Sequence, residues 1–224
     1  MKKFFCILLC LFAIPLLSQN ATDENTEPEV SDDIYNDQIY REITLEDFEA
    51  ENWDSKNVSM DILKDEKADL QSRTNFPAPI TNAGKKSQKY IGIKVYGKSG
   101  NVVTIKPKKV LSISQHCKSI SAWVYGKNFS GELSMMIQDG NGNTSRVIFP
   151  EKLNFLGWKK LTAKLGKNII QEDKFLSKTK KITILYFMYK PASITRLPQW
   201  NYFYMDDISA QVREKYLDKQ DDNW

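Results

Sequence analysis

Two adjacent carboxylates near the C-terminus, Asp206 and Asp207, are the side chains whose type and position come closest to a chemical site in this sequence. The apolar residues around them are Phe203 and Met205 before the pair and Ile208, Ala210 and Val212 after it. These two groups alternate in opposite phases, so the register of a strand flips at the carboxylates, as it does at a β-bulge. Adjacent acids at a bulge can bind calcium through oxygen, or they can hydrogen-bond backbone groups. We expect the structural role and no metal, with Asp206 and Asp207 as the candidate ligands if an ion binds.

No other arrangement of residues predicts catalysis. Consecutive carboxylates on a strand diverge, whereas the two acids of a glycosidase stand apart across one cleft. His116 and Cys117 are also consecutive and point to opposite faces, although a nucleophilic cysteine usually needs a histidine partner. Residues 139–143, which read DGNGN, match the start of an EF-hand loop but lack its later Gly and Glu, so they predict a hairpin turn. We therefore predict a protein that is not an enzyme and has no cofactor.

The aromatic residues are the remaining candidates for a binding function. Most tryptophans of a β-sandwich belong to its core, because large aromatics dominate such interiors. Trp123 and Tyr125 differ, since alternation places them opposite Ile120 and Val124 and directs them toward a second layer or a partner. The candidate partner-binding residues are Trp123, Tyr125, Trp200 and Tyr202.

Short runs rich in β-branched and aromatic residues, separated by Gly- and Asn-containing turns, must position these side chains. The predicted strands are Ile43–Phe48, Val58–Leu63, Lys89–Tyr96, Val102–Lys106, Ser119–Tyr125, Glu132–Gln138, Thr144–Phe149, Lys159–Leu165, Lys181–Tyr189 and Tyr202–Val212. Short helices are possible at Leu63–Leu70 and Gln171–Leu176. The pattern predicts an all-β fold, a single β-sandwich of two antiparallel sheets.

The alternation within the strands predicts which side chains fill the core. The seven core residues that we expect are Ile120, Val124, Leu133, Ile137, Leu161, Leu165 and Ile184. Residues Lys181–Tyr189 are apolar or aromatic on both faces, which predicts a central strand or one whose outer face is covered.

Charge divides the chain into segments. Residues 1–18 carry +2 and form a charged-then-apolar leader, which predicts a secretory signal peptide. Residues 19–52 hold twelve Asp or Glu against one Arg, a charge of −11, which leaves +13 for residues 53–224. We predict a signal peptide at 1–18, an acidic, disordered leader at 19–42, a β-sandwich domain at 43–212 and a polar C-terminal tail at 213–224. The net charge of +4 is too small to predict nucleic-acid binding, and no membrane span follows the leader.

Three runs together resemble one family. They are Lys118–Phe129 (KSISAWVYGKNF), Leu153–Lys159 (LNFLGWK) and Tyr202–Ile208 (YFYMDDI). In type and order they resemble the spirochaete flagellar filament outer layer (sheath) protein family, over roughly residues 43–212. The resemblance implies a periplasmic structural protein that coats a flagellin core, with flagellin core proteins and other filament sheath proteins as partners and no catalytic residues. The same skeleton resembles the jelly-roll fold of carbohydrate-binding modules.

The alternative function is a secreted carbohydrate-binding, lectin-like module. Such a module presents a row of exposed aromatics in a groove lined with polar groups. Burial discriminates the two: an open groove formed by Trp123, Tyr125 and Trp200 favours a lectin, whereas buried rings or a flat surface favour assembly.

Overall fold

The computed structural model describes residues 40–50, 53–60, 67–74, 87–175, 178–192 and 197–213. The predicted signal peptide at 1–18, residues 19–39 of the acidic leader and residues 214–224 of the tail lie outside the described residues.

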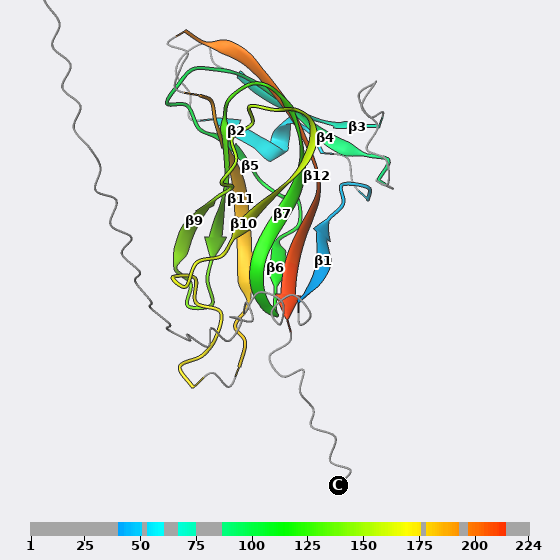
Figure 1. Ribbon diagram of the computed structural model, residues 1–224. Coiled ribbons are helices and arrows are strands. Elements are labelled where there is room, and N and C mark those ends of the chain that lie inside the picture. The colour runs from blue at the N-terminus through cyan, green and yellow to red at the C-terminus, as the bar shows by residue number, and fades with distance from the viewer. Residues whose placement is uncertain are drawn as a thin grey trace, which may run out of the picture.

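Two six-stranded sheets, in which every strand pairing is antiparallel, pack around one core (Figure 1). Sheet A has the order β10 (Leu156–Lys164), β7 (His116–Lys127), β12 (Gln199–Arg213), β4 (Tyr90–Gly97) and β3 (Lys67–Arg73), and β1 (Arg41–Glu46) also pairs with β12. Sheet B has the order β2 (Val58–Met60), β5 (Val103–Ile105), β11 (Ile182–Lys190), β8 (Glu132–Gln138) and β9 (Thr144–Ile148), and β6 (Leu111–Ile113) also pairs with β11. One 3₁₀ turn (Ser55–Asn57) precedes β2. This arrangement confirms the predicted jelly-roll-type β-sandwich.

The core lies between the inner faces of the two sheets, where apolar side chains alternate with outward ones. On β7, Ile120, Ala122 and Val124 are fully buried, and Leu133 and Ile137 of β8 meet the same cluster from sheet B. Removing such side chains from water stabilises the fold by about 1.5–3 kcal/mol each. Six of the seven predicted core residues are buried, and the seventh, Leu165, is half-buried where it follows the end of β10.

Strand β11 is central in sheet B, as its two apolar faces predicted. It pairs with β8 along one edge and with β5 and β6 along the other. Tyr189 near its end is buried against Phe203 of sheet A, with ring centroids 4.7 Å apart.

Two secondary-structure expectations are wrong. The predicted helix at 63–70 is contradicted over 67–70 by β3, whose residues pair along their whole length with β4, and residues 63–66 lie outside the described residues. The predicted helix at 171–176 is contradicted over 171–175, where Glu172 instead forms an isolated bridge with Thr179. At 67–70 hydrogen bonding to β4 overrides a weak local preference for helix, and at 171–173 hydrogen bonding to residues 178–180 does so. The three-residue strand β6 was not predicted, because it is too short for a periodic signal.

Strand β12 carries the predicted bulge and links two halves of sheet A. Its register against β7 shifts between Asp206 and Ser209, and Asp207 has a φ of 40°. On the opposite edge β12 pairs with β4 up to Met205 and with β1 from Ile208 (Figure 1). The bulge therefore lies where one neighbouring strand replaces the other. In the described part of the chain, no helix is long and apolar enough to span a membrane.

Candidate functional site

Four aromatic rings form a closed cluster on the outer face of sheet A. Cross-strand register aligns Trp158 of β10 with Tyr125 of β7, and Tyr125 with Tyr204 of β12. Neighbouring ring centroids lie 5.6 Å (Trp158–Tyr125), 5.4 Å (Tyr125–Tyr204), 5.3 Å (Tyr204–Tyr90) and 5.7 Å (Tyr90–Trp158) apart. Tyr90 and Tyr125 are buried, and burial together with the neighbouring Tyr204 raises the pKa of Tyr90. These rings form a fixed base across four strands.

A second, more open group of rings continues from this cluster along β12. Trp200 lies 5.1 Å from Tyr96 of β4 and stacks on Tyr202 at 6.2 Å, and Tyr202 in turn lies 6.1 Å from Phe129. Trp200 is 38% exposed, whereas the other three rings are half-buried. The four-ring cluster and this group together are called the aromatic platform below.

Three cationic side chains lie over the platform. The Lys94 ammonium is 4.0 Å from the centre of the Trp200 ring, and Lys127 is 5.4 Å from that of Tyr204. The Arg73 guanidinium lies 5.8 Å from the Tyr204 ring as well. Each such cation–π contact is worth about 0.5–1 kcal/mol at an exposed site. Within the described residues none of the three cations makes an ion pair with a carboxylate, so their charge faces outward.

Gly92 makes the position of Arg73 possible. A Cβ atom at Gly92 would lie 2.7 Å from Arg73 Nε and 3.3 Å from Tyr204 Cδ1. The missing side chain lets the arginine of β3 reach across β4 toward the ring on β12.

The structure brings three of the four predicted partner-binding residues onto the platform. Tyr125 belongs to its buried base, and Trp200 and Tyr202 to its open end. Trp123 is half-buried on the same face but makes no ring contact with the described residues, and it pairs with Lys160 and Asp206 on the neighbouring strands. It therefore lies beside the platform.

Sequence reasoning missed the rings and cations contributed by other strands. The platform is completed by Tyr90 and Tyr96 of β4, Tyr204 of β12, Trp158 of β10 and Phe129. Alternation was the available signal, since Trp200, Tyr202 and Tyr204 occupy every second position of one strand.

The carboxylates at the bulge play a structural part. Asp206 is fully buried, and its side chain accepts hydrogen bonds from the Ser87 hydroxyl at 2.7 Å and from the Asp207 backbone N–H at 2.8 Å. Among the residues that the structure describes, no group of three or more His, Cys, Asp or Glu side chains is arranged to hold a metal ion. These contacts give the Asp206 side chain a structural part at the bulge, and the absence of a metal at the pair stays a prediction.

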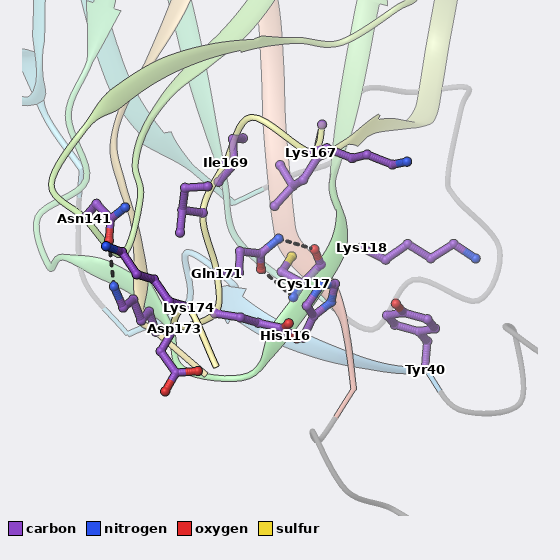
Figure 2. A pocket seen from close by; sticks show the side chains of 15 residues that line it. Tyr40, His116, Cys117, Lys118, Asn141, Lys167, Ile169, Gln171, Asp173 and Lys174 are labelled. Atoms are coloured by element: carbon purple, nitrogen blue, oxygen red, sulfur yellow. Dashed lines mark hydrogen bonds between the residues drawn. The ribbon is translucent and has the colours of Figure 1, made fainter. Parts of the chain in front are cut away.

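Cys117 is held in place by hydrogen bonds to the Gln171 side chain. Its backbone N–H donates to Gln171 Oε1 at 2.7 Å and its carbonyl accepts from Gln171 Nε2 at 2.9 Å, so the amide side chain pairs with the start of β7 (Figure 2). The thiol is buried and donates a hydrogen bond to the Ser119 carbonyl, and burial raises the pKa of the thiol to about 12. A thiol in this state is a poor nucleophile, because the thiolate is the reactive form.

We predict that Cys117 is unreactive in the folded protein. In a chain that begins at Gln19, where it is the single thiol, a disulfide reagent such as DTNB should label it about a thousandfold more slowly at pH 8 in the native state than in urea, because the thiolate is scarce and covered. Rapid stoichiometric labelling of the native protein would contradict this assignment.

The DGNGN segment is a hairpin turn between β8 and β9. The Asp139 carboxylate accepts hydrogen bonds from the backbone N–H groups of Asn141 (2.8 Å), Asn143 (2.9 Å) and Ile170 (3.4 Å). Burial alone would raise the pKa of Asp139, but these hydrogen bonds and one from the Asn143 side chain outweigh burial and hold it below its ordinary value of 3.8. The carboxylate is therefore occupied by the turn itself.

This lowered pKa predicts a pH dependence of stability. A carboxylate whose pKa falls on folding stabilises the fold at pH values above its unfolded pKa, and this stabilisation is lost as the pH falls toward the folded pKa. We expect urea-unfolding free energies measured between about pH 6 and pH 2 to decrease less steeply for Asp139→Asn than for the wild type. Glu151→Gln, which alters an exposed carboxylate, is the control and should keep the wild-type slope. If the free energy of unfolding decreased with falling pH equally in all three proteins, the lowered pKa of Asp139 would be contradicted.

The chain is similar to flagellar filament outer layer proteins. Residues 40–221 match the family model described as flagellar filament outer layer protein Flaa. A curated protein of Brachyspira hyodysenteriae, described as flagellar filament outer layer-like, is 35% identical over 104 residues, which cover 45% of this chain and 48% of that protein. The match thus spans about half the length of the curated relative.

Solved carbohydrate-binding modules are similar to this structure at low sequence identity. One module of the β-sandwich superfamily is 9% identical with a TM-score of 0.47, covering 74% of this chain and 60% of that chain. A family 11 module of a Clostridium thermocellum cellulase is 14% identical with a TM-score of 0.45, covering 80% of this chain and 98% of that chain.

Proposed function

Because the chain belongs to the FlaA family of flagellar filament outer layer proteins, we propose that it is a structural subunit of a periplasmic flagellar filament sheath. In this role it coats the flagellin core, contacts flagellin and other sheath subunits, and contributes to filament shape and motility. It acts by assembly and not by catalysis. Export by the predicted signal peptide would deliver it to the periplasm.

The observation that carries this proposal is the aromatic platform with its cationic border. Aromatic residues and arginine are enriched where proteins bind each other, and a few such residues supply most of the binding free energy. Trp200 is available at the surface, whereas Tyr90 and Tyr125 are buried and hold the base of the platform in place. A prearranged platform loses little side-chain entropy on binding.

The cations favour an acidic partner surface. Lys94, Lys127 and Arg73 make no carboxylate ion pair within the described residues, so they remain able to meet negative charge. Charges at the border of an interface mainly set the association rate and specificity, and salt screens them over about 10 Å at 0.1 M. The rings would then supply the adhesion that persists at higher salt.

The shape of the platform supports assembly over enclosure of a small ligand. The hollow between Tyr202, Tyr204 and Arg73 has a volume of about 150 Å³. Pockets that enclose small ligands usually measure about 300–1,000 Å³. Carbohydrate binding is the alternative, and it would use the same rings by stacking on sugar faces, with Asp69 and Gln71 as polar neighbours.

Mass spectrometry of purified periplasmic flagella tests the proposal. We expect this protein among the abundant filament components, with a mature N-terminus between Gln19 and Thr22. Absence from the filaments would contradict the proposal, and a native N-terminus at Met1 would contradict export. Retention on a glycan column together with absence from filaments would favour the carbohydrate-binding alternative.

A further inference from the structure

A pocket of about 570 Å³ lies at the end of the sandwich where β7 begins and β12 ends (Figure 2). None of its lining residues belongs to the aromatic platform. Its wall is built from the start of β7, the loop after β10 and the turn at Asn141. Cys117 and Gln171 form the back of the pocket through their paired hydrogen bonds, and Ile169 is buried beside them. Lys180 closes one side by donating to Asn141 Oδ1 at 2.6 Å. The pocket is thus a partly open hollow in which most of the lining surface is apolar.

Positive charge surrounds this apolar lining. Four lysines and two acidic residues line the pocket. The lysines are Lys118, Lys167, Lys174 and Lys180, and the acidic residues are Glu172 and Asp173. Within the described part of the chain, Lys167 and Lys174 make no ion pair. The pocket therefore suits a ligand that combines apolar groups with several negative charges.

The chain itself reaches the mouth of the pocket. Tyr40, the first described residue, lines it and leads into β1. Its hydroxyl accepts a hydrogen bond from Arg213 Nε at 3.1 Å, and Lys118 lies 5.1 Å from its ring centre. These contacts hold Tyr40 at the edge of the pocket.

The segment that precedes Tyr40 has matching chemistry. Residues 23–39 contain seven Asp or Glu and no Lys or Arg. Its apolar and aromatic residues are Val30, Ile34, Tyr35 and Ile39. Because the segment is tethered at the pocket, its effective concentration there is about millimolar, which lets weak contacts suffice.

We propose that the acidic segment 23–39 folds back from Tyr40 and occupies this pocket. Its apolar side chains meet the lining near Ile169, and its carboxylates meet Lys167 and Lys174. The segment covers much of the basic charge at this end of the sandwich and leaves the cations of the platform for a partner. The proposal does not depend on the filament function, and its test uses no filaments.

Amide hydrogen exchange of the native exported protein, followed by mass spectrometry, tests this docking. At low salt, amides of residues 23–39 should exchange about tenfold more slowly than in the free peptide of the same sequence. At about 1 M salt, where the Debye length is about 3 Å, most of this protection should disappear. The double variant Lys167→Glu/Lys174→Glu should lose it at low salt as well.

A second double variant and a dilution series establish whether the protection comes from docking in this pocket. Lys94→Glu/Lys127→Glu reverses two charges at the platform and should retain the protection, and unchanged exchange in β7 and β12 shows that each variant is folded. Protection that rises with protein concentration would overturn the proposal, because the occupant would then come from another copy. Exchange at the free-peptide rate at every salt concentration, or equal loss of protection in both double variants, would also overturn it.

Discussion

Trp200→Ala is expected to lower incorporation of the protein into filaments by about tenfold or more, because truncating a central interface tryptophan commonly costs at least about 2 kcal/mol. Trp200 is the exposed ring of the platform, held by Tyr96 on one side and Tyr202 on the other. Its loss removes apolar contact area and leaves the Lys94 ammonium without the ring beneath it. Because apolar contact is not screened, the defect should appear at low and at high salt.

Incorporation is measured by adding purified variants to filaments stripped of their outer layer and quantifying the bound fraction. Phe175→Ala is the matched control, since Phe175 is 88% exposed and lies outside the platform. It should bind like the wild type. Normal incorporation of Trp200→Ala at every salt concentration would show that the platform is not the interface, and would direct attention to the carbohydrate-binding alternative.

The parts of the fold that could be predicted are those where period-2 alternation is long and uninterrupted. Strands β7 and β8 and the central strand β11 were evident because their buried residues occupy alternate positions or fill both faces. The prediction of a helix at 63–70 was wrong over 67–70. Lys67–Arg73 has only one fully buried residue, Leu70, so its sequence shows no strand alternation, and it becomes a strand through pairing with β4. Edge strands of this kind depend on a partner that is distant in sequence.

The candidate surface was harder to predict for the same reason. Trp200 and Tyr202 could be identified on one strand, but Arg73 reaches the neighbouring Tyr204 ring from β3, a strand that the sequence did not predict. Its approach across Gly92 depends on three strands lying side by side, an arrangement that local patterns do not encode. The bulge was predictable because the phase change at Asp206 is visible in consecutive residues.

The largest effect on stability is expected at Asp206. Asp206→Ala should lower the free energy of unfolding by about 2–4 kcal/mol, because it leaves the Ser87 hydroxyl and the Asp207 backbone N–H without their acceptor, at about 1–3 kcal/mol for each donor. The Asp206 carboxylate accepts from Ser87 and from the Asp207 backbone at the place where β12 exchanges β4 for β1 as its neighbour. The loss should therefore weaken both halves of sheet A at once. Urea unfolding followed by tryptophan fluorescence measures this difference.

Asp207→Asn is the matched control for this substitution. Asparagine tolerates the positive φ of this position, so the variant should differ from the wild type by less than about 1 kcal/mol. A similar loss in both variants would show that the bulge conformation, and not the Asp206 hydrogen bonds, stabilises the junction. Calcium provides the second test. Because hydrogen bonds within the chain already engage the Asp206 carboxylate, the wild type should have the same melting temperature in calcium and in a chelator. A melting temperature that rises with calcium in the wild type and not in Asp206→Ala would mean that the pair is a metal site, and the structural assignment would be wrong.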